Sequence, residues 1–318
     1  MKNYTKILIP LVAWLLATLP LQATKYAGDI FAISPGVLST AMGGTGLTYR
    51  DSYAAGWWNP ALLAGEPDAG LELMHSQHFE GLLKQNQLSL IFGSKTRSSL
   101  TVNHLMIDKI KLTRLENPAD SLSNENRPIV WKTVSNQDLI LSMGLARQLR
   151  ENLFLGLSPK LAYRSLAQNS GYAFGADLGL LWQSSEKVSL SANLRDFFST
   201  QVLWENGTHE LVVPNLDLEI GYNWKLFHKL PAHLALRSEL QATETEATLS
   251  SKAISADLHA GLVLQALPNL RLLTGYDADA ITAGLGINYQ RFGLNYAFRN
   301  GSQDDLGYSQ RISASYKW

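Results

Sequence analysis

The histidines and glycines of the chain are the residues whose spacing first suggests chemistry. His75 and His78 stand three residues apart, which would place them on opposite faces of a strand, so a two-histidine metal site is not expected there. Gly43, Gly44 and Gly46 resemble a phosphate-binding loop, but no lysine and no preceding buried strand accompany them. A flexible turn fits these glycines better. No metal and no cofactor are therefore predicted.

The serines and cysteines offer no nucleophile for catalysis. Serine is abundant, yet no Gly-x-Ser-x-Gly element occurs and no serine is paired with a histidine at a useful spacing. Cysteine is absent, so thiol chemistry and disulfides are excluded. A phospholipase built on a β-barrel is one hypothesis for the chain, but it lacks this serine and histidine pair. We do not expect an enzyme.

A second set of reactive residues is charged and recurs at alternate positions within apolar segments. The set comprises Lys160, Arg164, Asp177, Arg195, Asp217, Glu219, Arg237, Glu239, Asp257, His259, Arg299 and Arg311. A period of two places such residues on one face of a strand and the apolar residues on the other. We expect the charged residues to line a wet interior and to pair with one another or with a segment that fills it. A substrate path along them is the less favoured hypothesis.

These residues need strands to position them, and the sequence supplies strands from about residue 69 to the end. Ile281, Leu285 and Tyr289, for example, alternate with polar residues or glycine. The predicted strands cover 69–76, 86–94, 98–110, 137–148, 152–164, 172–183, 187–197, 214–225, 232–242, 253–265, 270–276, 280–290, 291–299 and 306–318. Their number, about fourteen, is even and typical of bacterial outer-membrane barrels.

The connections between these strands alternate in length. Short links are predicted at 95–97, 149–151, 184–186, 226–231, 266–269 and 290–291, and longer polar loops at 77–85, 111–136, 165–171, 198–213, 243–252 and 300–305, with 277–279 as a short exception. Outer-membrane barrels have short periplasmic turns and longer outer loops. The pattern therefore predicts an all-β, transmembrane, antiparallel barrel with its N-terminus in the periplasm.

Aromatic residues favour the membrane barrel over a soluble β-sandwich. They gather at the ends of the apolar faces, at Tyr163, Phe174, Trp182, Trp224, Tyr276, Tyr289 and Trp318, as the aromatic girdles of such barrels do. The last strand carries Tyr316 and ends on Trp318, the kind of closing strand that the barrel assembly machinery receives. Outer-membrane lipid and this machinery are therefore expected partners.

Composition and the N-terminus agree with export to the outer membrane. Residues 1–23 combine a basic start, a short apolar run and a small residue, Ala23, which is the layout of a secretory signal peptide. No second stretch is long and apolar enough for a membrane helix. The formal net charge is zero and 46% of residues are hydrophobic, so no nucleic-acid partner is expected.

Residues 24–68 differ from the predicted barrel at 69–318. They are rich in small residues, lack strand alternation and contain glycine breaks. A barrel of about fourteen strands has a lumen wide enough to need a plug. We therefore predict that 24–68 folds inward as an N-terminal hatch.

The hatch also carries a family resemblance. The stretch Ala41-Met42-Gly43-Gly44-Thr45-Gly46 and the later Trp57-Trp58-Asn59-Pro60-Ala61 resemble the N-terminal signature of the PorV/PorQ family, within the superfamily of FadL-like fourteen-stranded barrels with a hatch. The small-aromatic step of that signature reads Gly56-Trp57-Trp58 here, which affects packing more than assignment. The resemblance covers nearly the whole chain after residue 23.

The resemblance implies two functions that the sequence leaves open. PorV-type proteins belong to type IX secretion, where they hold cargo by its C-terminal domain, and the loops 111–136 and 198–213 would then bind secretion-system proteins and cargo. FadL-type proteins are passive transporters of long-chain fatty acids or other hydrophobic compounds, and an apolar pocket lined by Trp57 and Trp58 would then lie between hatch and wall. The secretion role is the first expectation, because the whole hatch block matches.

Overall fold

The computed structural model of the chain describes residues 29–33, 35–65, 68–93, 97–167, 169–242, 247–251, 254–301 and 307–318. The predicted signal peptide, residues 1–23, lies outside the described residues. In the described part of the chain, no helix has the length and apolar character needed to cross a membrane.

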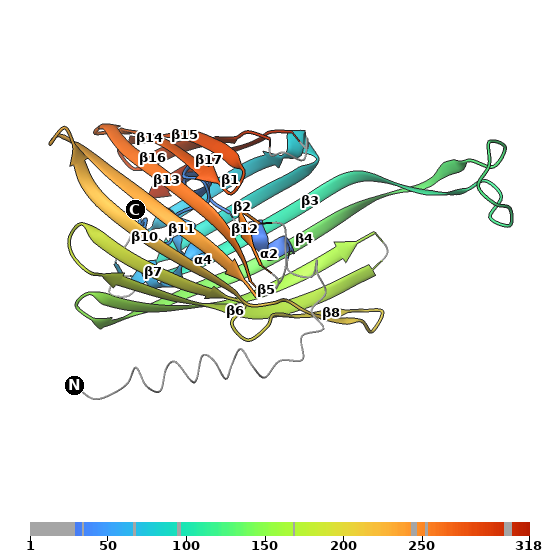
Figure 1. Cartoon of the computed structure of the whole chain (residues 1–318), viewed down its shortest axis with the longest axis horizontal. Coiled ribbons are helices and arrows are strands. Elements are labelled where there is room, and N and C mark those ends of the chain that lie inside the picture. The colour runs from blue at the N-terminus through green and yellow to red at the C-terminus, as the bar shows by residue number, and fades with distance from the viewer. Residues whose placement is uncertain are drawn as a thin grey trace.

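Fourteen antiparallel strands form a closed barrel (Figure 1). They are β1 (Gly70–His78), β2 (Leu83–Phe92), β3 (Ser98–Leu115), β4 (Pro128–Arg150), β5 (Leu153–Leu166), β6 (Asn169–Gln183), β7 (Val188–Arg195), β10 (Asn215–Leu226), β11 (Leu230–Gln241), β13 (Ser255–Leu267), β14 (Leu270–Asp277), β15 (Ala280–Tyr289), β16 (Phe292–Arg299) and β17 (Ser309–Lys317). Each strand pairs with its neighbours, and β17 pairs with β1 to close the wall. Three short strands, β8 (Gln201–Trp204), β9 (His209–Leu211) and β12 (Leu249–Ser250), belong to the links. The predicted fold class is confirmed.

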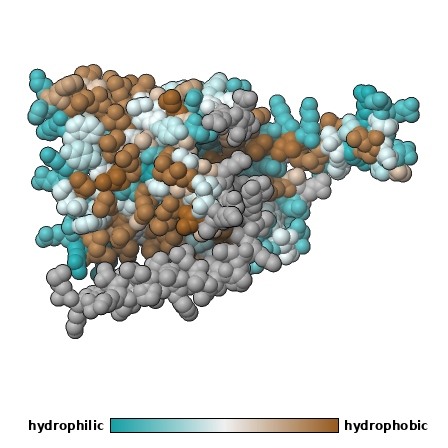
Figure 2. Space-filling view, viewed as in Figure 1, coloured by the Kyte–Doolittle hydropathy of each residue, from teal (hydrophilic) through white to brown (hydrophobic). Residues whose placement is uncertain are grey.

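Alternation along each strand separates an apolar outer surface from a buried inner one. In β16, Leu294 is 47% exposed while its neighbour Asn295 is 3% exposed. Figure 2 shows apolar side chains over the middle of the wall and polar ones at its ends. Such an outer surface suits lipid, because every backbone polar group of a closed barrel is already paired within the sheet.

The two ends of the barrel differ in their links. At one end, here called the turn end, the links are short: 93–97, 151–152, 184–187, 227–229, 268–269 and 290–291. At the other, the loop end, lie the links 79–82, 116–127, 167–168, 196–214, 242–254, 278–279 and 300–308. The predicted alternation of short and long links is thus present in part, because 79–82, 167–168 and 278–279 are short links at the loop end and the predicted longer loops 77–85 and 165–171 are mostly strand or tight turn.

Two other predicted loops were wrong in their structure. Residues 111–136 are not an irregular loop, because β3 and β4 continue past the barrel as a two-stranded ribbon that ends in the link 116–127. Figure 1 shows this ribbon projecting from the loop end, clear of the other strands. Register shifts near Ile107 and Leu112 break the period of two, which hid these strand segments from the sequence pattern. The predicted loop 198–213 likewise contains the hairpin of β8 and β9.

The N-terminal segment lies inside the barrel and fills it as a plug. It contains α2 (Asp29–Ala32), α3 (Val37–Ala41), α4 (Ala55–Trp58) and the 3-10 helix η1 (Pro60–Gly65). α3 contacts β14 to β17, and η1 contacts β4 to β6. Nearly all residues from 35 to 63 are buried. The hatch element of the fold prediction is therefore present, while the exact boundaries 24–68 and 69–318 stay predictions.

Candidate functional site

The glycine block of the plug lies directly against the backbone of the wall. Gly43 has φ +66 and Gly44 has φ +77, both in the left-handed region. A Cβ atom on Gly43 would lie 2.5 Å from the backbone nitrogen and oxygen of Tyr276, and one on Gly275 would lie 2.3 Å from the nitrogen of Gly43. Plug and wall therefore meet backbone to backbone here. The glycines at 43 and 44 therefore permit a backbone conformation and a close approach to the wall that a larger residue at 43 would prevent.

Charged and polar wall side chains hold the same stretch of the plug, residues 41–48, which we call the clamped loop. Glu219 of β10 accepts hydrogen bonds from the backbone nitrogens of Gly46 (2.9 Å) and Thr48 (2.8 Å) and from the Thr48 hydroxyl (2.7 Å). Arg237 of β11 donates to the carbonyl of Gly44 (2.5 Å). Because these bonds end on the backbone, they fix the path of the chain and not one side chain.

Further wall contacts continue the clamp on neighbouring strands. The Thr282 hydroxyl of β15 donates to the carbonyl of Ala41 (2.9 Å), and Arg311 of β17 donates to the carbonyl of Gly36 (3.4 Å). Nδ1 of His259 on β13 lies 3.0 Å from the carbonyl oxygen of Gly43. Three strands in addition to β10, namely β11, β13 and β15, therefore hold the clamped loop, and β17 holds the chain just before it.

The predicted charged residues face the lumen and are paired there. Arg195 and Arg237 both contact the carboxylates of Asp217 and Glu239. The remaining pairs of this set are Lys160 with Asp177 and Asp196, Arg164 with Asp138, Arg299 with Asp277 and Asp279, and His259 with Asp277. Asp257 accepts hydrogen bonds from Thr248. Pairing with one another and with the plug is what the alternation led us to expect. The acidic partners that were not predicted are Asp138, Asp196, Asp277 and Asp279.

The Trp57-Trp58-Asn59-Pro60-Ala61 element forms the second contact of plug and wall. The side chain of Asn59 is fully buried: Nδ2 donates to Ser191 Oγ (2.7 Å) and to the carbonyl of Leu47 (3.1 Å), while Oδ1 accepts from the nitrogen of Ala61 (3.0 Å). A Cβ on the wall residue Gly156 would lie 2.2 Å from that same nitrogen of Ala61. Asn59 thus positions the turn into η1 against the backbone of the wall at Gly156, which has no side chain.

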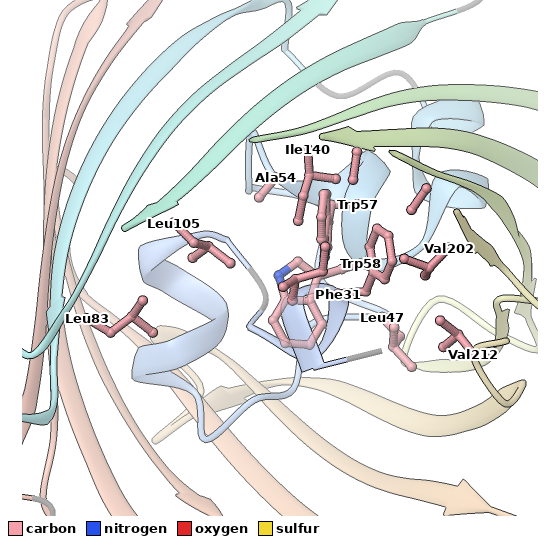
Figure 3. Close-up of a cluster of buried hydrophobic side chains, with 13 residues drawn as sticks. Phe31, Leu47, Ala54, Trp57, Trp58, Leu83, Leu105, Ile140, Val202 and Val212 are labelled. Carbon is pink, nitrogen blue, oxygen red and sulfur yellow. The ribbon is translucent and has the colours of Figure 1, made fainter. Parts of the chain in front are cut away.

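An apolar compartment interrupts the polar lumen near β2 to β6. Its buried members are Ile30, Phe31, Leu47, Ala54, Trp57 and Trp58 of the plug with Leu83, Leu105, Ile140, Ala162, Ala173, Val202 and Val212 of the wall and its links. Figure 3 shows Phe31 and Trp58 in the middle of this cluster. The expected apolar pocket lined by Trp57 and Trp58 is therefore filled, because both indoles and the α2 segment pack into it.

Two cavities flank the plug. At the loop end a cavity of about 420 Å³ is bordered by Ile33, Trp58 and Phe79 together with charged residues such as Arg237 and Glu239. At the turn end a polar cavity of about 370 Å³ is bordered by Arg50, Tyr53, Glu72 and Arg271. Burial, with the nearby carboxylates of Asp68 and Glu72, raises the pKa of Tyr53 to about 12, so the phenol stays neutral. The plug therefore separates an amphipathic mouth from a polar one.

The other predicted site residues are placed as follows. His75 is exposed and bonds Asn86, whereas His78 is buried and bonds Gln85, so the two histidines do face opposite ways. Within the described ranges, no three His, Asp or Glu side chains lie close enough together to hold a metal ion.

The closing strand carries the other two predicted residues. The Tyr316 ring lies 5.2 Å from that of Phe292 on β16, and the nitrogen of Trp318 donates to the carbonyl of Ala69 (3.2 Å). Trp318 therefore ties the end of the chain to the residue before β1, where the wall closes, and the Tyr316 ring packs against β16.

α2 and its contact with Lys160 were not foreseen. Nζ of Lys160 lies 4.5 Å from the centre of the Phe31 ring, whereas the sequence pattern predicts Lys160 only as a member of the charged set. The stretch Ile30-Phe31 is too short to show a helical period. Its apolar character was the one available signal.

Comparison with known proteins places the fold. No protein-family model and no curated protein matches the chain. The Pseudomonas putida toluene transporter TodX matches with a TM-score of 0.58 at 14% identity, over 90% of this chain and 99% of TodX. The Ralstonia pickettii toluene transporter TbuX matches with 0.54 at 12% over 90% and 98%, and a Pseudomonas aeruginosa FadL homologue with 0.53 at 9% over 89% and 98%. The chain therefore has the FadL-like barrel fold, and membership of the PorV/PorQ family is not shown.

Proposed function

We propose that this protein lies in the outer membrane and lets small hydrophobic compounds cross it through a lumen that its N-terminal plug controls. In this proposal the loop end faces the outside of the cell and the turn end faces the periplasm, since short turns are periplasmic in such barrels. The proposal takes up the transport function that was the second expectation from the sequence.

The observation that carries the proposal is the apolar compartment inside an otherwise polar lumen. A water-filled pore gains nothing from buried Leu83, Leu105 and Ile140 on its inner wall, whereas a hydrophobic solute gains from each apolar contact, by about 25 cal/mol per Å² buried. The compartment lies beside the cavity of about 420 Å³ that opens at the loop end. The likeness in fold to TodX and TbuX, which are toluene transporters by name, supports the same function.

The test is uptake by intact cells of a Gram-negative host that lacks its own transporters of this kind. Radiolabelled toluene and oleate are the hydrophobic probes, and a tetrasaccharide is the polar control. We expect the protein to speed uptake of at least one hydrophobic probe and to leave the tetrasaccharide unchanged. Leu105→Lys, which puts a charge into the compartment, should abolish the gain at equal surface expression. Equal uptake with and without the protein would overturn the proposal.

The projecting ribbon supports a second candidate function, the binding of a protein partner outside the cell. Its strands expose Ile129, Val130 and Trp131 at 41%, 52% and 45%, and a two-stranded ribbon is marginally stable by itself in water. Type IX secretion components and cargo were the partners expected from the sequence, and fold comparison gives that reading less support than transport. Capture of exported proteins on the ribbon in source cells, compared with cells carrying a ribbon-deleted chain, tests it.

A further inference from the structure

We infer that the apolar compartment holds a binding site for one aromatic ring, formed around Lys160 and occupied here by the chain's own Phe31. This inference rests on the proposed function and names the class of compound that the compartment selects: small hydrophobic molecules that carry an aromatic ring. Phe31 then acts as a ligand from within the chain, which an incoming ring replaces.

The geometry at Lys160 is that of a cation facing a ring. Nζ lies 4.5 Å from the centre of the Phe31 ring, inside the distance of about 6 Å within which a cation is attracted to the face of an aromatic ring. Both side chains belong to residues that are 4% exposed. Because water is largely excluded, the attraction is stronger here than on a protein surface.

Two aspartates hold the Lys160 ammonium in this position. Nζ lies 2.8 Å from Asp177 Oδ1 and 2.7 Å from Asp196 Oδ1. The backbone nitrogen of Asp196 donates to the same Asp177 oxygen (2.8 Å), and the Thr200 hydroxyl donates to Asp196. The cation is therefore fixed before any ring arrives, so a ligand need not order it.

Phe31 differs from the two other rings that face a cation at the edge of the compartment. The Trp58 ring lies 5.3 Å from Arg237, and the Trp204 ring lies 5.4 Å from Arg164. Each indole is also tied by its N–H, to the carbonyl of Pro35 (2.8 Å) and to Glu210 (2.9 Å) respectively. The Phe31 ring has no polar atom, so packing and Lys160 are what hold it. An aromatic ligand offers both of these contacts equally well.

A route to the Phe31 position exists on the side of the loop end. The cavity of about 420 Å³ is bordered by Ala32 and Ile33, which follow Phe31 directly, and by Trp58 and Phe79. The cluster that contains Phe31 also includes the aliphatic wall residues Leu105, Ala162 and Ala173. A toluene-sized molecule that displaced Phe31 would meet this apolar cluster and the Lys160 ammonium, which is also paired with Asp177 and Asp196.

Toluene and methylcyclohexane separate ring recognition from simple burial, since they have the same carbon skeleton and only toluene has a π face. Their dissociation constants are measured by headspace gas chromatography over the purified full chain in detergent, with detergent alone as the blank. Phe31→Ala should tighten toluene binding about ten-fold or more and methylcyclohexane binding clearly less. Phe31→Leu, which keeps an apolar side chain in place but loses the ring, should fall between the native chain and Phe31→Ala.

Substitution at Lys160 tests the cation itself. In the Phe31→Ala background, Lys160→Met with Asp177→Asn removes the cation together with one carboxylate and should erase the preference for toluene. Lys160→Arg in the same background keeps a cation and should retain it. If the first combination does not fold, as judged by loss of the heat-dependent gel shift of intact barrels, the comparison of Phe31→Ala with Phe31→Leu still tests ring recognition.

The inference is overturned if Phe31→Ala binds toluene no better than the native chain, or tightens both compounds equally, which is what a purely structural Phe31 predicts. A preference for toluene that survives loss of the cation overturns it as well. These binding measurements need no membrane. Selective binding of toluene without any uptake by cells would therefore contradict the proposed transport and support the ring site. Uptake by cells without selective binding would support transport and contradict the ring site.

Discussion

The clamped loop and the apolar compartment hold the plug by different physics. In the clamped loop, residues 41–48, wall groups such as Glu219 and Arg237 bind backbone atoms with fixed geometry. In the compartment, Phe31 and Trp57 are held mainly by burial among aliphatic side chains. Hydrogen bonds to a buried backbone cannot be replaced by a hydrocarbon, whereas apolar contacts can. A hydrophobic ligand can therefore compete with the plug side chains in the apolar compartment, but it cannot compete with the hydrogen bonds that hold the clamped loop.

Loss of the Glu219 carboxylate should break the clamped end most severely. Glu219→Ala leaves two buried backbone N–H groups and the Thr48 hydroxyl without their acceptor, which costs roughly 3 kcal/mol or more in seating the plug. We expect large, steady ion conductance of this variant in planar bilayers and little conductance of the native chain. Glu219→Gln keeps one acceptor oxygen and should give a smaller rise. If the Glu219→Ala barrel does not conduct ions, the hydrogen bonds of Glu219 are not what holds the plug in place.

Gly43→Ala should have the next largest effect, because its methyl group would meet the backbone of Tyr276 at 2.5 Å. We expect conductance that flickers, since the loop must shift while its hydrogen bonds persist. Gly81→Ala is the matched control: Gly81 also has a positive φ, +92, but nothing lies within 4 Å of an added Cβ. Backbone strain alone, about 1 kcal/mol, should leave Gly81→Ala closed. Equal conductance of the two variants would contradict the role given to close approach.

Leu105→Ala tests the apolar compartment. Unlike the changes at the clamped loop, it should alter ligand binding and not ion conductance. Leu105 is 2% exposed within the cluster, and its truncation leaves a cavity that lowers the free energy of unfolding by about 2–3 kcal/mol. We expect a lower urea midpoint and tighter binding of toluene, with conductance as low as in the native chain. If Leu105→Ala raises the ion conductance of the barrel, the clamped loop and the apolar compartment do not differ in the way described here.

Replacement of the ribbon residues 111–133 by a short turn should have the smallest effect on plug and barrel. These residues pair only with each other, and the pairs of β4 with β5 begin at Gln137. We expect unchanged urea midpoint, conductance and toluene uptake, with loss confined to any protein partner of the ribbon. A destabilised barrel would mean that the ribbon supports the wall.

Much of the fold was predictable because one signal repeats along the chain. All fourteen wall strands appear where the period of two placed them, and Asn295 beside Leu294 shows the alternation plainly. The ribbon escaped because two β-bulges shift its phase, so that local alternation fails although the pairing continues. Periodicity therefore finds regular strands and misses those that a bulge interrupts.

The contacts inside the lumen were predictable by type but not by partner. The alternation predicts that Glu219 faces inward. Its partners Gly46 and Thr48 lie 171 residues or more before it in the sequence, so they depend on how the plug is placed against β10. Phe31 and Lys160 meet for the same reason, across a barrel whose register no local pattern encodes. The functional prediction was limited in the same way. Resemblance in the hatch pointed first to secretion, whereas the apolar compartment, which forms only when plug and wall pack together, favours transport.

The most direct test of the central claim, that the plug must move for a hydrophobic compound to pass, is a reversible lock between plug and wall. Asn59 Nδ2 lies 2.7 Å from Ser191 Oγ, and the native chain has no cysteine, so Asn59→Cys with Ser191→Cys places a single pair of thiols at this contact for oxidation. Each single cysteine variant is the control for loss of the native hydrogen bonds. We expect toluene uptake by cells to stop when the pair is oxidised and to return on reduction. Undiminished uptake by the fully oxidised pair would contradict the account.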